Sequence, residues 1–130
     1  MSLVALDPNE IIDTFEVVQE SNTLMNFLNS QAYPNQIVVV YFAEFPCKAC
    51  DDQKAFMRAL PNKYPDVVFF QVPKGSPITK NNMWCNDVAV YPTTKFFKNF
   101  ATTQNCTAYY IGYGPEQIEG WIQSHLEPLQ

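Results

Sequence analysis

Hydrophobic and polar positions along the chain predict a sheet flanked by helices. Two apolar runs, at residues 36–42 and 66–72, contain β-branched and aromatic residues without polar alternation, which indicates strands buried on both faces. Between them, residues 47–60 carry apolar side chains at helical spacing, and the breakers that begin at Pro61 are expected to end this helix. Because a helical crossover joins the two strands, we expect them to pair in parallel.

Further elements are expected on either side of these strands. The preceding residues predict, in order, a helix at 8–14, a strand at 15–18 and a helix capped by Ser21. The following residues predict a helix capped by Ser76 and running to about Cys85, a hairpin of strands 93–98 and 107–111 around a polar loop at 99–105, and a helix at 115–126. This order predicts an α/β fold, a three-layer α/β/α sandwich with a central mixed sheet of four to five strands.

Length, composition and charge limit the classes of function. The 130 residues fit a single domain spanning 1–130, in which residues 1–14 form an N-terminal extension and residues 1–3 could be a cloning remnant. Eight basic and thirteen acidic residues give a net charge of −5, which argues against a nucleic-acid partner. Because no apolar run reaches the roughly 18 residues of a membrane span, we expect no membrane insertion. We expect a monomer.

Two cysteines stand where the first buried strand gives way to the long helix, in the run Cys47-Lys48-Ala49-Cys50. Such a pair is typical of a redox dithiol. At the helix N-terminus, backbone N–H groups and the helix dipole favour the thiolate, so Cys47 is the expected nucleophile. Cys50 lies one turn further in and is expected to be more buried, as the thiol that resolves a mixed disulfide.

Two separated motifs resemble the thioredoxin superfamily. The first is the strand at 36–42 followed by Ala43-Glu44-Phe45-Pro46 and the dithiol. The second, Tyr91-Pro92-Thr93-Thr94-Lys95-Phe96-Phe97, is similar to a run in protein disulfide isomerase domains, where the proline is cis and faces the dithiol. The resemblance implies a thioredoxin-like fold and a protein disulfide isomerase-like thiol-disulfide oxidoreductase. It also implies an external redox donor or acceptor, with no metal or organic cofactor.

The same resemblance implies a substrate site around the dithiol. Phe45, Pro46, Tyr91 and Pro92 would contact the backbone of a protein or peptide substrate. Because proline has no N–H, an extended substrate could pair with backbone groups beside Pro92. We therefore expect peptide rather than nucleotide substrates.

The chain departs from the family's pattern around the dithiol. Pro46 occupies the position directly before the first cysteine, and Lys-Ala replaces Gly-Pro or Gly-His between the cysteines. The buried acid that relays a proton in relatives falls at Val40 or Tyr41, neither of which accepts a proton at neutral pH. We therefore expect slow resolution of mixed disulfides. A redox-inactive or weakly active thioredoxin-like binding module remains the alternative function.

The other candidate residues have simpler interpretations. Cys85 and Cys106 are interpreted as structural or incidental thiols, with a second disulfide or a regulatory site as the alternatives. One CxxC and scattered single ligands lack the paired spacing of a zinc site. His125 is expected to pack or to favour the helix dipole at the C-terminus of the last helix. The triplet Asn105-Cys106-Thr107 fits a glycosylation site, which slightly favours the secretory pathway, in the lumen of the endoplasmic reticulum, over the cytoplasm.

Overall fold

The computed structural model describes residues 11–30, 36–44, 47–80, 88, 90–104, 106–112 and 114–126. Its elements follow one another in this order: β1 Glu16–Val17, α1 Ser21–Asn29, β2 Val38–Ala43, α2 Lys48–Lys63, β3 Val68–Pro73, the 3-10 helix η2 Pro77–Lys80, β4 Thr93–Phe97, α3 Phe100–Thr103, β5 Ala108–Ile111 and α4 Pro115–His125. No helix among these residues is long and apolar enough to cross a membrane.

The strands form one five-stranded mixed sheet in the order β1-β3-β2-β4-β5. Both β1 and β2 run parallel to β3, with Tyr41 opposite Gln71, whereas β4 is antiparallel to β2 and to β5. Every residue of β2 is buried, as its unbroken apolar run predicts for a central strand. The expected parallel pair, the hairpin and the mixed sheet are confirmed.

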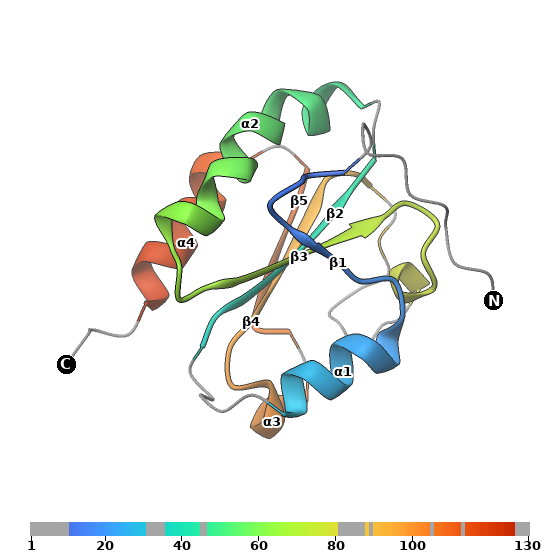
Figure 1. Cartoon of the computed structure of the whole chain (residues 1–130), viewed down its shortest axis with the longest axis vertical. Coiled ribbons are helices and arrows are strands. Elements are labelled where there is room, and N and C mark those ends of the chain that lie inside the picture. Colours follow the sequence, from blue (N-terminus) through green and yellow to red (C-terminus); the bar gives the residue numbers. More distant parts are fainter. Residues whose placement is uncertain are drawn as a thin grey trace.

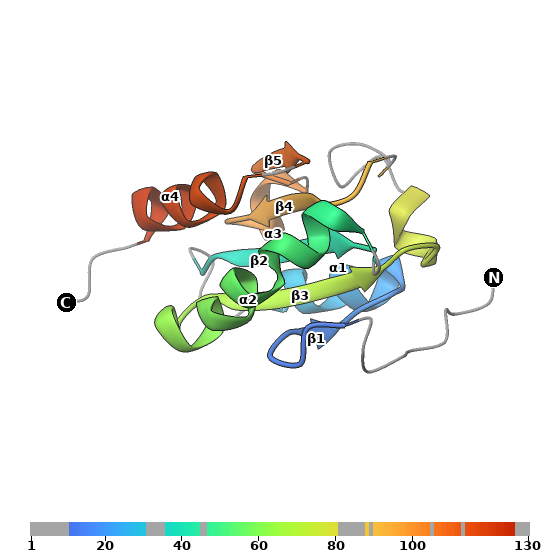
Figure 2. The same cartoon turned by 90° about the horizontal axis from the view of Figure 1, so that it is seen from above.

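Helices cover both faces of this sheet, with α2 and α4 on one side and α1 and α3 on the other (Figures 1 and 2). Because side chains alternate along a strand, β2 supplies both halves of the core. Val39 and Tyr41 join the cluster under α2 and α4, whereas Val38, Val40 and Phe42 join the cluster under α1 and α3. The three-layer α/β/α sandwich is confirmed.

A stack of rings attaches α4 to the sheet. The ring of Phe96 in β4 lies 4.4 Å from that of Trp121, and the Trp121 ring lies 3.8 Å from the His125 imidazole. His125 Nδ1 is 2.8 Å from the carbonyl oxygen of Trp121, and Lys98 donates to the carbonyl oxygen of His125. His125 thus packs at the end of α4, in agreement with the packing role expected for it.

The helix predicted at 8–14 is wrong for its described part, residues 11–14, which form a turn before β1. The side chain of Gln71, in strand β3, binds this turn through hydrogen bonds. Its Oε1 accepts from the N–H of Ile12 at 2.7 Å, and its Nε2 donates to the carbonyl oxygens of Ile12 and Phe15 at 2.6 and 2.9 Å. These buried bonds use backbone groups that a helix would need for its own ladder.

The predicted end of the long helix is also wrong, because α2 continues through Pro61 to Lys63. A proline lacks an N–H donor, and within the last turn this removes a single bond of the ladder. The N–H of Tyr64 then donates to the carbonyl oxygen of Leu60 at 2.8 Å and completes that turn.

Three smaller expectations need correction. Ser21 is the first residue of α1 rather than its cap, which is Glu20 and has no side-chain bond to the helix. A short helix does follow Ser76, as η2, but the Ser76 hydroxyl donates to the carbonyl oxygen of Pro73 and so stabilises the turn after β3 instead of capping this helix; its predicted end near Cys85 lies outside the described residues. The polar loop at 99–105 contains α3, anchored by the buried Phe100.

Candidate active site

Cys47 is the N-cap of α2. The preceding strand delivers it in an extended conformation, with φ −157° and ψ 126°, and its sulfur accepts the N–H of Cys50 at 3.2 Å. This is the place that a serine or aspartate oxygen takes in most helix caps. The backbone N–H and the positive end of the helix dipole both favour negative charge on this sulfur, which is partly exposed. Cys47 is thus the partly exposed sulfur at the N-terminus of α2.

Cys50 lies beneath it, with no exposed surface. The two sulfurs are 2.7 Å apart and both thiols are free. A disulfide of normal length needs them to approach by only roughly 0.6 Å more. Burial, together with the hydrogen bond with Cys47, raises the pKa of Cys50 to about 12, and the Glu44 N–H, 3.5 Å from the sulfur, partly offsets this rise. The pair thus combines one partly exposed thiol with one buried thiol, and the expectation that Cys50 is the more buried of the two is confirmed.

Charged side chains surround the start of α2. The Asp51 carboxylate accepts the N–H of Cys47 at 3.2 Å, and Lys48 pairs with Asp52 at 3.3 Å. Lys48 is 91% exposed, so its charge is largely screened by water.

The peptide bond between Tyr91 and Pro92 is cis, as the resemblance implies. Pro92 is buried and its carbonyl oxygen accepts the N–H of Gly112 at 2.7 Å, which attaches this turn to the end of β5. Tyr91 packs against the hydrophobic cluster that contains Cys50 and that Cys47 also contacts. The structure thus gathers Cys47, Cys50 and Tyr91 around one cluster. Two predicted substrate contacts, Phe45 and Pro46, lie outside the described residues.

An ion pair at the rim of the site is absent from the sequence-based prediction. Lys74 Nζ lies 3.0 Å from Glu44 Oε1 and 5.9 Å from the centre of the Tyr91 ring. Glu44 follows β2 directly and Lys74 follows β3 directly, and the carboxyl ends of parallel strands meet at one edge of a sheet. The positions of Glu44 and Lys74, each directly after one of two parallel strands, are the signal in the sequence from which this ion pair could have been predicted. The pair connects both strand ends to the aromatic ring before the cis-proline.

The strand under the dithiol carries no carboxylate. Val40 and Tyr41 are both fully buried, with Val40 in the cluster under α1 and α3. Tyr41 lies on the opposite face, where its hydroxyl donates to Gln53 Oε1 at 2.8 Å. The buried side chains of the described residues include no Asp or Glu. A buried acid for Cys50 is therefore missing from this part of the chain.

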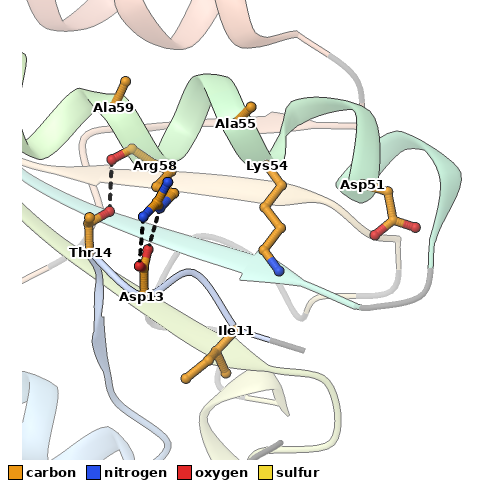
Figure 3. A pocket seen from close by; sticks show the side chains of 8 residues that line it. All are labelled: Ile11, Asp13, Thr14, Asp51, Lys54, Ala55, Arg58 and Ala59. Atoms are coloured by element: carbon orange, nitrogen blue, oxygen red, sulfur yellow. Dashed lines mark hydrogen bonds and ion pairs between the residues drawn. The ribbon is translucent and has the colours of Figure 1, made fainter. Parts of the chain in front are cut away.

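A groove of about 680 Å³ follows α2 away from the dithiol (Figure 3). Its lining combines the N-terminal turn with one side of the helix: Ile11, Asp13, Thr14, Asp51, Lys54, Ala55, Arg58 and Ala59. Arg58 donates two hydrogen bonds to Asp13, at 2.6 and 2.9 Å, and these bridge the groove at one end. Asp51, which accepts the N–H of Cys47, lies at the other end and links the groove to the dithiol.

Cys106 is disulfide-bonded, so the preferred interpretation of this residue as a thiol is wrong and the alternative of a second disulfide applies. It is half-buried and packs against the cluster under α1 and α3. Cys85 lies outside the described residues. Within the described ranges, no three His, Cys, Asp or Glu side chains gather to hold a metal ion.

No family model matches the sequence, and no curated protein is a significant match to it. Solved structures do match. Thioredoxin from Nicotiana alata superposes with a TM-score of 0.71 at 22% identity, covering 95% of this chain and 99% of that one. The fold is the thioredoxin fold.

Two further thioredoxins agree with this assignment. Thioredoxin from Fasciola hepatica has a TM-score of 0.71 at 20% identity, covering 86% of this chain and 100% of its own. Mitochondrial thioredoxin 3 from Saccharomyces cerevisiae has a TM-score of 0.70 at 20% identity, with coverages of 87% and 97%. At such identities the likeness establishes the thioredoxin-like fold, and the argument for activity comes from the dithiol.

Proposed function

We propose that this chain is a thiol-disulfide oxidoreductase that acts on protein disulfides. The observation that supports it best is the dithiol itself, in which the sulfur of Cys47 caps a helix and touches the buried sulfur of Cys50. In the proposed reaction the Cys47 thiolate attacks a substrate disulfide, forming a mixed disulfide and releasing one substrate thiolate, which takes up a proton. Cys50 then attacks Cys47, closes the intramolecular disulfide and releases the second substrate thiol. An external thiol then reduces the Cys47–Cys50 disulfide and is itself oxidised to a disulfide, which resets the pair.

The finer proposal is a protein disulfide isomerase-like role in an oxidising compartment. The cis-proline motif supports it, because Tyr91 and Pro92 belong to the run that resembles isomerase domains. The disulfide at Cys106 supports it too, since structural disulfides persist in oxidising surroundings such as the secretory pathway. Substrate contacts would come from Tyr91 and Pro92, with Phe45 and Pro46 next to them in the chain.

Reduction of insulin disulfides, followed as turbidity with dithiothreitol as electron donor, tests the proposal. The unmodified chain should accelerate precipitation over dithiothreitol alone, and Cys47→Ser should abolish the acceleration. Cys50→Ser should retain part of it only, because external thiol must then release the mixed disulfide. Equal rates for the unmodified chain and Cys47→Ser would favour the alternative, a redox-inactive binding module, which the missing strand carboxylate makes the second candidate.

A further inference from the structure

Two buried polar side chains lie beside the dithiol and take no part in the reaction proposed above. Tyr41, in β2, has no exposed surface, and its hydroxyl donates to Gln53 Oε1 at 2.8 Å. Gln53 is 1% exposed and follows Cys50 by one turn on the inner side of α2. Tyr41 and Cys50 belong to one hydrophobic cluster, against which Cys47 packs. An amide and a phenol are thus enclosed in the core next to the sulfur pair.

The amide nitrogen of Gln53 is the unusual atom of this group. It is buried and has no hydrogen-bond partner among the residues that the structure describes. The Tyr41 hydroxyl holds the carbonyl oxygen of Gln53, so the side-chain amide cannot rotate without losing that hydrogen bond. A buried donor without an acceptor destabilises the folded state, whereas an apolar side chain of similar size would not.

Resolution of a mixed disulfide creates a thiolate, and therefore a hydrogen-bond acceptor, at Cys50 in the same cluster as Tyr41. Cys50 must become a thiolate before it attacks Cys47, and burial raises its pKa to about 12. Among the described residues that act on its pKa, Cys47 is engaged in the mixed disulfide, and Glu44 contacts the sulfur through its backbone N–H, so neither serves as a base. Burial also raises the pKa of Tyr41, so its hydroxyl stays protonated and remains a donor.

We propose that the side-chain amide of Gln53 donates a hydrogen bond to the sulfur of Cys50 as it becomes a thiolate, and that Tyr41 is the positioning residue that orients this amide. The inference rests on the proposed function. In the step concerned, the Cys50 thiol loses its proton to solvent and the thiolate attacks Cys47 Sγ. The Cys47–Cys50 bond forms, the bond from Cys47 to the substrate sulfur breaks, and the departing thiolate takes up a proton. Gln53 stabilises the negative charge without itself gaining or losing a proton.

A chromogenic aromatic disulfide, 5,5′-dithiobis(2-nitrobenzoate), separates the two steps in one stopped-flow trace. Attack by Cys47 releases the first nitrothiobenzoate, and attack by Cys50 on the mixed disulfide releases the second. Gln53→Met should slow the second phase by about tenfold near neutral pH, the effect of about one hydrogen bond to a charged group, and should leave the first unchanged. Tyr41→Phe, which keeps the ring, should slow the second phase by roughly threefold.

Stability separates this role from a structural one. Gln53→Met alone would leave the buried Tyr41 hydroxyl without its acceptor, so stability is measured on the double variant Gln53→Met/Tyr41→Phe. This variant removes both buried polar groups together, and its urea midpoint should equal or exceed that of the unmodified chain. Met57→Leu, one turn further along the same buried side of α2, is the matched control and should change neither phase. A second phase that is unchanged in Gln53→Met, or in Tyr41→Phe if the first variant does not fold, overturns the inference while the proposed function stands. A second phase missing from the unmodified chain overturns both.

Discussion

The cap formed by Cys47 allows a sharp prediction about two nearly isosteric variants. Cys47→Ser keeps an acceptor for the N–H of Cys50, which the native sulfur accepts at 3.2 Å, whereas Cys47→Ala leaves that N–H without a cap. Loss of a helix cap costs about 1 kcal/mol, so the alanine variant should be less stable than the serine variant by that amount. For a chain of this length the difference corresponds to roughly 3–5 °C in Tm.

Urea unfolding followed by tryptophan fluorescence measures this difference. Trp121 is 8% exposed and stacks on Phe96, so unfolding changes its surroundings strongly. Lys48→Ala is the matched control, since this exposed side chain at the first helical position makes no cap bond, and its midpoint should stay unchanged. Coincident midpoints for Cys47→Ser and Cys47→Ala would refute the reasoning, because the sulfur would then not cap α2.

Three further outcomes follow from the structure. Gln71→Leu should lower the free energy of unfolding by about 2–4 kcal/mol, because the buried N–H of Ile12 and carbonyl oxygen of Phe15 lose their partner, and an unchanged urea midpoint would contradict this. In the reduced protein, the pKa of Cys50 is raised to about 12, so as pH rises the unfolded chain loses this proton at a lower pH than the folded chain does. The free energy of unfolding should therefore fall above roughly pH 8.5, by at most about 1.4 kcal/mol per pH unit. Urea titrations of Cys50→Ala should show a smaller slope, and an equal slope would count against the raised pKa. Arg58→Ala should leave the urea midpoint nearly unchanged, because its ion pair is exposed; a large shift would give the groove beside α2 a structural role.

The elements that position the site are predictable from the sequence for a physical reason. Strands β2 and β3 are buried on both faces, so each reads as a continuous apolar run, and a helix between them leaves parallel pairing as the expected arrangement. The order of these elements places the dithiol at the start of α2, independently of the conformation of the loop between β2 and α2. The thioredoxin-like resemblance and the cis bond before Pro92 follow from short motifs in the right order.

The remaining features depend on contacts between distant residues. Gln71 looks like one polar interruption of a strand, and nothing local shows that it binds a turn 59 residues earlier. Gln53 likewise looks like a solvent-facing helix residue until packing places it under Tyr41. The disulfide at Cys106 requires a meeting of sulfurs in space that spacing along the chain does not specify. The predicted end of the long helix before Pro61 is wrong because a proline is tolerated in the last turn of a helix, where only one hydrogen bond is lost.

The most direct test of the central claim is to trap the mixed disulfide. Each single cysteine variant is incubated with a peptide that contains one disulfide, and the adduct is located by mass spectrometry of proteolytic fragments. Cys50→Ser should accumulate the peptide on Cys47, and Cys47→Ser should accumulate none, because Cys50 is buried and its thiol stays protonated. An adduct on neither cysteine, or an adduct on Cys50 in Cys47→Ser at a comparable rate, would contradict an oxidoreductase in which Cys47 attacks and Cys50 resolves.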